Sequence, residues 1–299
     1  ARRGHIRTVL VNGAECEPFI TSDHRTMLEH TDLIVKGVAL LKRYLESEEF
    51  IIGIEKNKPD AIEKLTNAFA DDPAVTVKPL KSVYPQGAKQ VLLYNATGKV
   101  VSPGQRLASL GVIIINVTSL TKVAQYMNDG MPLVEKTVTV DGSAVAKPKN
   151  VIVPIGMRIG DVFEACGGFC EEPKKVLYGG PMMGIAQYTL RTATIKGNNA
   201  LTCYSDKDRH ETPNPHCIRC GKCVEACPMH LMPLFLHRAV NRGDLERLDE
   251  LHVMDCIECG SCAYGCPAGI PLVQSFRTGK KLVRDAAARE KAKKEAAAK

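Results

Sequence analysis

The stretches Cys217-Ile-Arg-Cys-Gly-Lys-Cys-Val-Glu-Ala-Cys-Pro228 and Cys256-Ile-Glu-Cys-Gly-Ser-Cys-Ala-Tyr-Gly-Cys-Pro267 decide how the last third of this 299-residue chain folds. Each stretch spaces four cysteines as C-x2-C-x2-C-x3-C and ends on proline, and together they hold eight of the twelve cysteines. The first cysteines of the two runs are 39 residues apart (256 minus 217), so this part of the chain is an internal repeat. Two sets of four crowded thiols predict two metal centres.

The spacing is that of bacterial ferredoxins and predicts two 4Fe–4S clusters. A cubane presents four irons, each of which binds one thiolate, and a C-x2-C-x2-C loop is short enough to reach three of them. The fourth cysteine lies where a helix can begin, and in two-cluster ferredoxins it binds the other cluster. The expected ligands are therefore Cys217, Cys220, Cys223 and Cys266 for cluster 1, and Cys227, Cys256, Cys259 and Cys262 for cluster 2.

Other roles for these thiols fit the sequence less well. Structural zinc also binds four thiolates, but zinc sites usually combine two separate C-x2-C pairs. Disulfides are not expected, because clustered free thiols suit a reducing cytosol and the sequence contains no secretory signal that we recognise. Iron–sulfur clusters pass single electrons, so the sequence first indicates electron transfer.

The charges within the two cysteine loops differ. Arg219 and Lys222 lie in the first loop, whereas the second contains Glu258 and no cation. Positive charge stabilises the more negative, reduced cluster and so raises its reduction potential. Although Glu225 offsets part of the charge near the first loop, the sequence predicts that cluster 1 has the higher potential.

Strands and helices alternate over residues 1–130. Apolar, β-branched segments at residues 8–11, 50–54, 75–77 and 112–115 predict strands. Helices are predicted over residues 32–45, 59–70, 86–93 and 121–127. This alternation predicts βαβ units and a mainly parallel sheet, hence an α/β domain.

Three further segments follow the α/β domain. Residues 131–200 predict a small β-grasp domain, with strands at 134–140, 150–154 and 175–178, a helix at 161–165 and a turn at Asp141-Gly142. Residues 201–276 form the cluster domain, with a helix expected over 232–240. Residues 277–299 are a basic Ala/Lys-rich tail, expected to form a solvated helix.

Composition excludes two broad classes of function. The formal net charge is +7, but residues 277–299 contain nine Lys/Arg against three Asp/Glu, so the rest of the chain is nearly neutral. A nucleic-acid-binding protein needs a basic face on a folded domain, so no nucleic-acid partner is expected. No apolar stretch approaches the ~18 residues of a membrane span, so we expect a soluble or peripheral protein with no transmembrane segment of its own.

Five motifs outside the cysteine runs resemble the RnfC family of the Rnf electron-transport complex. They are Val11-Asn-Gly-Ala-Glu-Cys-Glu-Pro18, Ile20-Thr-Ser-Asp-His-Arg25, Tyr84-Pro-Gln-Gly87, Ile115-Asn-Val-Thr-Ser119 and Gly179-Gly-Pro-Met-Met-Gly184. The first two domains are also similar to the flavin subunit of respiratory complex I. The resemblance implies a complex-I flavin-subunit-like α/β domain, an SLBB-like β-grasp domain and a helical, bacterial-ferredoxin-like two-cluster domain, with FMN and NAD(H) bound at the first.

The resemblance also implies eight cofactor-binding residues: Asn12, Glu15, Cys16, Glu17, Tyr84, Gly87, Asn116 and Ser119. The first three match positions that line the flavin, and Glu17 matches the acid beside the nicotinamide nucleotide. The next two match the turn below the isoalloxazine, and the last two match the phosphate-ribityl end. The alternative for residues 12–17 is a polar connection between a strand and a turn.

Two features of this chain depart from the relatives. They carry a glycine-rich loop that wraps the FMN phosphate upstream of the first strand, and the chain begins on Ala1 too late to contain it. We therefore expect the natural protein to be longer at its N-terminus and the FMN site of this chain to be incomplete. Lys89 stands where many relatives have Glu.

The implied function is electron transfer within an ion-translocating ferredoxin:NAD+ oxidoreductase. The chain is then a peripheral subunit on the cytoplasmic face of the bacterial inner (plasma) membrane, with no catalytic side chain of its own. Its expected partners are NAD(H) and the other membrane and ferredoxin-like subunits. One alternative is a soluble NADH-dependent flavin/iron–sulfur reductase of a corrinoid or another acceptor. A second is an assembly scaffold with structural clusters.

Overall fold

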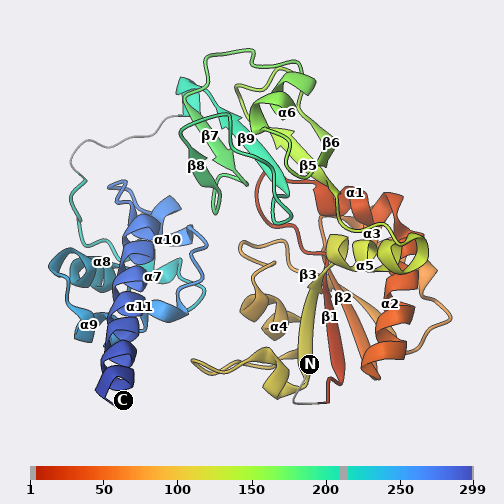
Figure 1. Ribbon diagram of the computed structural model, residues 1–299, viewed down its shortest axis with the longest axis horizontal. Coiled ribbons are helices and arrows are strands. Elements are labelled where there is room, and N and C mark those ends of the chain that lie inside the picture. The colour runs from red at the N-terminus through yellow and green to blue at the C-terminus, as the bar shows by residue number, and fades with distance from the viewer. Residues whose placement is uncertain (1–4, 209–214, 298–299) are drawn as a thin grey trace. The chain divides into compact units, whose positions relative to one another are not determined.

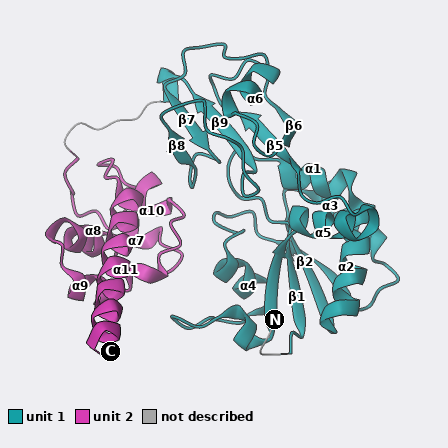
Figure 2. Cartoon of the chain, in the orientation of Figure 1, with its two compact units in different colours: residues 1–209 teal, residues 210–299 magenta. Residues whose placement is uncertain are grey.

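The computed structural model describes residues 5–208 and 215–297, and the chain divides into two compact units (Figure 2). The first unit, residues 1–209, contains the α/β domain and the β-grasp domain. The second unit, residues 210–299, contains both cysteine runs. The mixed α/β, β-grasp and helical order expected from the sequence is confirmed (Figure 1).

A four-stranded parallel sheet is the centre of the α/β domain. Its strands lie in the order β3-β2-β1-β4. They are β1 (Thr8–Asn12), β2 (Glu49–Glu55), β3 (Val75–Leu80) and β4 (Val112–Asn116). The four predicted strands are confirmed. The chain adds β2 and β3 on one side of β1 and β4 on the other, so the strand order reverses between β1 and β4. In open α/β sheets, ligands bind beyond the carboxyl ends of the strands at such a switch point.

Helices cover both faces of this sheet. They are α1 (Ser22–Glu29), α2 (Thr31–Leu45), α3 (Pro59–Ala68), α4 (Lys89–Thr97) and α5 (Val117–Asp129), with a short 3-10 helix at Leu107–Leu110. Alternate residues of a strand face opposite sides, so Val9 and Val11 pack in one core with α1, α2, α3 and α5. Leu10 packs in a second core with α4 on the other face. Figure 1 shows this division.

Two details of the α/β domain differ from the sequence-based expectation. The helix predicted over residues 86–93 begins only at Lys89, because Tyr84 to Ala88 form a turn in which the Ala88 N–H bonds the Pro85 carbonyl. Helix α1 was not expected at all. It is short and polar and buries few apolar side chains, so its sequence carries no helical apolar pattern.

The β-grasp domain is built on a five-stranded sheet in the order β6-β5-β9-β7-β8. The strands are β5 (Glu135–Asp141), β6 (Lys149–Pro154), β7 (Lys175–Tyr178), β8 (Ile185–Gln187) and β9 (Ala200–Tyr204), and α6 (Ile159–Ala165) packs on them. The expected boundary between residues 200 and 201 falls inside β9, which pairs with β5 and β7. A short 3-10 helix follows at Asp206–Asp208.

Gly142 explains the turn after β5. Its φ is +115°, and a Cβ there would stand 2.1 Å from the carbonyl oxygen of Cys203. Glycine is therefore required at this position on both backbone and steric grounds.

The second unit is helical and follows the repeat of the sequence. Its helices are α7 (Lys222–Glu225), α8 (Pro233–Arg242), α9 (Leu245–Glu250), α10 (Ser261–Tyr264) and α11 (Leu272–Ala297), with a 3-10 turn at Val253–Asp255. The helices α8 and α11 begin 39 residues apart (272 minus 233), as the cysteine runs do. The helix predicted over residues 232–240 is confirmed as α8.

Helix α11 crosses the boundary expected at residue 277. Its first turns bury Phe276, Gly279 and Lys280 in the core of the cluster domain. The basic tail therefore continues a core helix. In the described parts of the chain, no helix combines the length and apolarity needed to cross a bilayer.

Candidate functional site

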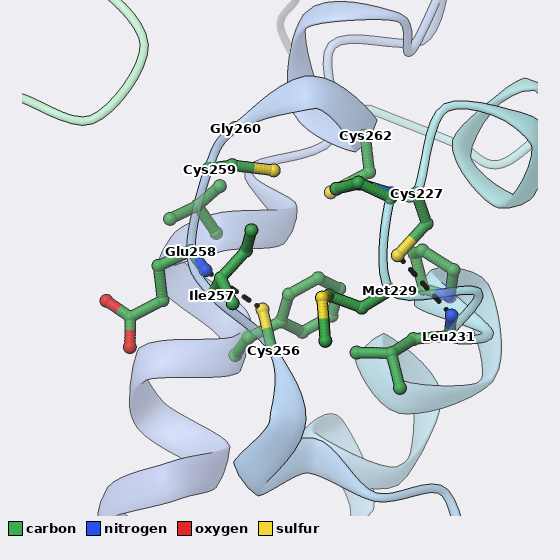
Figure 3. Close-up of a pocket in the computed structure, with 13 residues that line it drawn as sticks. Cys227, Met229, Leu231, Cys256, Ile257, Glu258, Cys259, Gly260 and Cys262 are labelled. Atoms are coloured by element: carbon green, nitrogen blue, oxygen red, sulfur yellow. Dashed lines mark hydrogen bonds between the residues drawn. The ribbon is translucent and has the colours of Figure 1, made fainter. Parts of the chain in front are cut away.

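The second cysteine loop and the end of the first run enclose one cavity of the cluster domain. Its lining includes the thiols of Cys227, Cys256, Cys259 and Cys262. Figure 3 shows Cys227 facing the 256–262 loop across the cavity, so the fourth cysteine of run one lies with the first three of run two. Backbone N–H groups reach two of these sulfurs, from Glu258 to Cys256 and from Leu231 to Cys227, each at 3.4 Å.

The first cysteine loop encloses a matching cavity of about 220 Å³. It is lined by Cys217, Cys220, Cys223 and Cys266. Cys217 and Cys220 are exposed, whereas Cys259 and Cys262 of the second loop are buried. The two cavities therefore contain the same thiol sets that the sequence grouped, but the first is more open to solvent.

The electrostatics of the thiols reflect the same grouping. Burial raises the pKa of Cys262 to about 12, and the charges of Cys256, Cys259 and Cys227 raise it further. Burial also raises the pKa of Cys223, with a contribution from Cys266. Thiols that oppose each other's ionisation become thiolates when a cation compensates their charge. Each set of four thiols is therefore suited to bind a metal cluster.

The spacing of the donors fits a cluster better than a single ion. Within residues 5–208 and 215–297, no three Cys, His, Asp or Glu side chains converge closely enough to bind one metal ion. Four thiols distributed around a cavity are what a cubane requires, since each binds a different iron. The N–H···S hydrogen bonds would also stabilise the ligand sulfurs when a cluster is bound.

The two loops share their backbone conformation but not their charge. Arg219 and Glu258 occupy equivalent places (258 minus 39), and both have φ in the left-handed region, at +60° and +55°. Each N–H group donates to the sulfur two residues earlier, at 3.4 Å. The repeat therefore holds opposite charges against equivalent sulfurs.

The second loop gains cations that its own sequence lacks. Arg277 Nε donates to Glu258 Oε2 at 2.9 Å, and Lys280 Nζ donates to Glu258 Oε1 at 2.7 Å. Burial alone raises the pKa of the Glu258 carboxyl, but the hydrogen bonds from Lys280 and Arg277 outweigh it and lower the pKa. The second loop itself contains no cation, as its sequence shows, but α11 supplies two to Glu258.

A cleft of about 440 Å³ lies beyond the carboxyl ends of the strands of the α/β sheet. Of the eight residues implied to bind cofactors, it is lined by Glu15, Cys16, Glu17 and Tyr84. The other four lie outside its lining. Asn12 and Asn116 are register partners at the ends of β1 and β4, so they mark the switch point itself.

Glu15 caps a helix that the sequence did not reveal. Its Oε1 accepts from the Asp23 N–H at 2.8 Å and its Oε2 from the His24 N–H at 3.1 Å, both in the first turn of α1. Ser22 Oγ also donates to Oε1. Burial, followed by the charge of Asp23, raises the pKa of Glu15 to about 7. The carboxyl is therefore engaged within the protein.

Glu17 connects the two domains of the first unit. Its Oε1 accepts from the N–H groups of Met182 and Met183 at 2.9 and 2.8 Å, within the Gly179–Gly184 motif. A Cβ on Gly180 would stand 2.2 Å from Glu17 Cγ. Burial raises the pKa of Glu17, whereas its hydrogen bonds with the two methionine N–H groups and the Tyr84 side chain lower it. The sequence named both motifs but not their contact.

Asn12, Cys16 and Gly87 form a second set of internal contacts. Asn12 Nδ2 donates to the Gly87 carbonyl at 3.1 Å, and the Gly87 N–H donates to Cys16 Sγ at 3.4 Å. Burial raises the pKa of Cys16 to about 11, so it accepts as a thiol. A Cβ on Gly87 would stand 2.8 Å from the Ala14 carbonyl oxygen. Glycine at this position allows the turn to approach β1.

Asn116 and Ser119 form the N-terminal cap of α5. Asn116 Oδ1 accepts from the Ser119 N–H at 3.3 Å, and Asn116 Nδ2 donates to Asp23 Oδ2 at 2.7 Å. Thr118 Oγ1 donates to the other Asp23 oxygen at 2.6 Å. The helix begins at the switch point, where its amino end carries partial positive charge.

The cleft contains a buried ion pair that was not predicted from the sequence. Lys58 Nζ donates to Glu55 Oε2 at 2.7 Å, and both side chains are less than a tenth exposed. The Glu15 N–H also donates to Glu55 Oε2. Glu55 ends β2 and Lys58 precedes Pro59 of α3. Their position at the carboxyl end of a buried parallel strand was the available signal.

The raised pKa of Glu15 predicts a pH dependence. A carboxyl whose pKa rises from 4.5 to about 7 on folding stabilises the fold below its unfolded pKa, and this contribution is lost as pH rises towards 7. Stability of the α/β domain should fall by on the order of 3 kcal/mol from this group across that range. The Glu15→Gln variant should lack this slope. Urea unfolding at about pH 5 and about pH 8, followed by hydrogen exchange of α1, measures both slopes.

Family models match the three domains in the same order. The model for the Nuo51 FMN-binding domain matches residues 1–125, that for the SLBB domain residues 137–186, and that for the 4Fe-4S dicluster domain residues 216–270. Fold, thiol arrangement and family models together define a protein with a flavin-type α/β domain, an SLBB domain and a dicluster ferredoxin domain.

Curated relatives are similar to this chain over nearly its whole length. The chain is 43% identical over 286 residues to the C subunit of the proton-translocating ferredoxin:NAD(+) oxidoreductase complex of Clostridium ljungdahlii. It is 40% identical over 273 residues to the C subunit of the Na(+)-translocating complex of Acetobacterium woodii. These matches cover 95% and 91% of this chain and 62% of each relative. The chain is thus similar to the C subunits of ion-translocating ferredoxin:NAD(+) oxidoreductase complexes and spans about three-fifths of these relatives' length.

Solved structures support the fold. An NAD+-reducing NiFe hydrogenase in its H2-reduced state is similar over 93% of this chain and 56% of the hydrogenase chain, with a TM-score of 0.60 and 16% identity. The same hydrogenase type in the air-oxidised state gives a TM-score of 0.58. At this identity the likeness concerns the arrangement of the chain alone.

Proposed function

We propose that this chain is an electron-transfer subunit of a membrane-associated ferredoxin:NAD+ oxidoreductase coupled to ion translocation. The observation that carries the proposal is the gathering of eight cysteines around two cavities, in a chain about 40% identical to the C subunits of such complexes. Electrons pass between NAD(H) and FMN at the α/β domain and partner subunits by way of the clusters.

The cysteines have defined roles in this proposal. Cluster 1 is held by Cys217, Cys220, Cys223 and Cys266, and cluster 2 by Cys227, Cys256, Cys259 and Cys262. When bound, each cluster takes up and releases one electron. The protein fixes the thiolates around the cavity, donates N–H groups to the sulfurs and places cations near the loops, all of which set the potential.

The nucleotide end of the proposal rests on the α/β domain. The match to the FMN-binding domain and the 440 Å³ cleft support binding at the carboxyl edge of the sheet. Among the implied residues, Glu15, Cys16, Glu17 and Tyr84 line this cleft. Asn12 and Gly87 hold the turn beside the cleft through a hydrogen bond. Asn116 and Ser119 lie at the N-terminus of α5, where the backbone N–H groups favour an anionic group.

We place the protein at the periphery of the bacterial inner membrane, on its cytoplasmic face. Its partners are the other membrane and ferredoxin-like subunits and NAD(H). The support is the naming of the relatives as subunits of ion-translocating complexes. The names of the relatives, which are those of subunits of ion-translocating oxidoreductase complexes, do not favour a corrinoid reductase.

Anaerobic reconstitution of the chain with iron and sulfide tests this function. We expect about eight irons and about eight acid-labile sulfides per chain, as two cubanes require. In the full-length protein FMN should also bind, and NADH should then bleach the cluster absorbance. Co-expression with the membrane subunits should retain the chain on the membrane. Zinc in place of iron, with no acid-labile sulfide, would overturn the proposal.

A further inference from the structure

One helix brings a buried cation to the backbone of the second cysteine loop. Lys280 lies in the third turn of α11 and is only 8% exposed. Its Nζ donates both to the carbonyl oxygen of Cys256 and to Glu258 Oε1. Cys256 is a proposed ligand of cluster 2, so the ammonium group is fixed beside the chain atoms that hold the cluster.

The first repeat has no counterpart of this cation. The position equivalent to Lys280 is Asn241 (280 minus 39), whose amide contacts His237 at 3.1 Å. The position equivalent to Glu258 is Arg219, which is exposed. The loop charges of the two repeats therefore differ: the first loop carries its own cations, whereas the second receives Lys280 from the helix behind it. Arg277 is not part of this difference, because the first repeat has Arg238 at the equivalent position (277 minus 39).

The charges beside the two loops differ in burial. Arg219, Lys222 and Glu225 beside the first loop are all exposed. Glu258 and Lys280 form an ion pair behind the second loop, and their side chains are 25% and 10% exposed. Exposed charges are screened by water and salt, whereas a buried charge acts through a lower effective dielectric constant.

From this arrangement we infer that Lys280 is a positioning residue that sets the reduction potential of cluster 2. Its charge stabilises the extra electron of the reduced cluster, while its bonds to Cys256 and Glu258 keep the loop at a fixed distance from that charge. Glu258 acts in the opposite sense and limits the effect. The inference rests on the proposed cluster ligands; that cluster 1 has the higher potential stays a prediction.

An EPR-monitored redox titration of the reconstituted full chain tests this role. In Lys280→Met, the reduced-to-oxidised ratio of one cluster at fixed potential should fall about tenfold, a shift of about 59 mV for a one-electron couple. The other midpoint should not move. Lys280→Arg, which keeps the charge, should leave both midpoints near the wild-type values.

Two further variants separate charge from structural support. Glu258→Gln should raise the same midpoint that Lys280→Met lowers, because it removes a negative charge from the same loop. A purely structural anchor predicts that both variants disturb the cluster in the same direction. Lys281→Met is the matched control, since Lys281 is the exposed neighbour on the same helix, and both midpoints should stay in place.

The outcomes are distinguishable. Two clusters with unchanged midpoints in Lys280→Met overturn this inference alone, and so does an equal shift of both midpoints. Loss of about four irons in Lys280→Met without an upward shift in Glu258→Gln also overturns it, because Lys280 is then only an anchor. Wild-type protein without acid-labile sulfide removes the proposed function itself.

Discussion

Replacing Cys227 with alanine should empty the cluster site of the other repeat and leave the site of its own run occupied. Cys227 belongs to the first run in sequence, but it lines the cavity of Cys256, Cys259 and Cys262. Without its thiolate, one iron of cluster 2 has no protein ligand. Iron should fall from about eight to about four per chain, measured after anaerobic reconstitution.

Assigning the surviving cluster requires a marker for each site. In the Cys227→Ala background, adding Glu258→Gln should no longer move any midpoint, because the cluster beside Glu258 is absent. In the matched Cys266→Ala background the same substitution should still raise the surviving midpoint. Cys170→Ala, a cysteine outside both cavities, should keep the full iron content. A Cys227→Ala protein that still responds to Glu258→Gln would show that each run binds its own four-thiolate cluster.

Local sequence patterns predicted the parallel sheet well. The segments around Val9, Phe50, Val75 and Val112 are short, apolar and rich in β-branched residues. They form strands because both faces of a parallel sheet are buried. The cysteine runs were equally informative, because a C-x2-C-x2-C loop imposes its geometry within a few residues. In both cases the deciding interactions are close in sequence.

Contacts between distant segments escaped prediction. Nothing in the sequence near Glu258 indicates that Lys280, 22 residues later, will fold back onto it. The first turns of α11 bury Lys280 in the cluster domain, whereas most residues from 284 to 297 are exposed, as expected for a solvated tail. Helix α1 was missed for a related reason, since its first turn is capped by Glu15 from the preceding loop.

The same limit applies to the cofactor-binding residues taken from the resemblance. These residues lie at the carboxyl edge of the parallel sheet, and their binding of a cofactor stays a prediction. The sequence did not show that Glu15 caps a helix or that Asn116 caps another. Their internal hydrogen bonds mean that part of their role is to shape the cleft.

Replacing Glu17 with alanine should loosen the junction between the α/β and β-grasp domains. The Met182 and Met183 N–H groups would lose the charged acceptor that they share. Hydrogen bonds to charged groups contribute about 1.5–3 kcal/mol each, so we expect a loss of about 2–4 kcal/mol for this partly buried pair. Hydrogen exchange of the Met182 and Met183 amides, followed by mass spectrometry, measures it.

Matched variants separate this structural role of Glu17 from a role in nucleotide binding. Glu17→Gln keeps an oxygen that can accept from both N–H groups, so the amides of Met182 and Met183 should stay largely protected. If the carboxylate also contacts NADH, this variant should weaken NADH binding. Glu63→Ala, an exposed carboxylate on α3, should change neither property. Unaltered protection of the two methionine amides in Glu17→Ala would contradict the junction role, because those N–H groups would then have another acceptor.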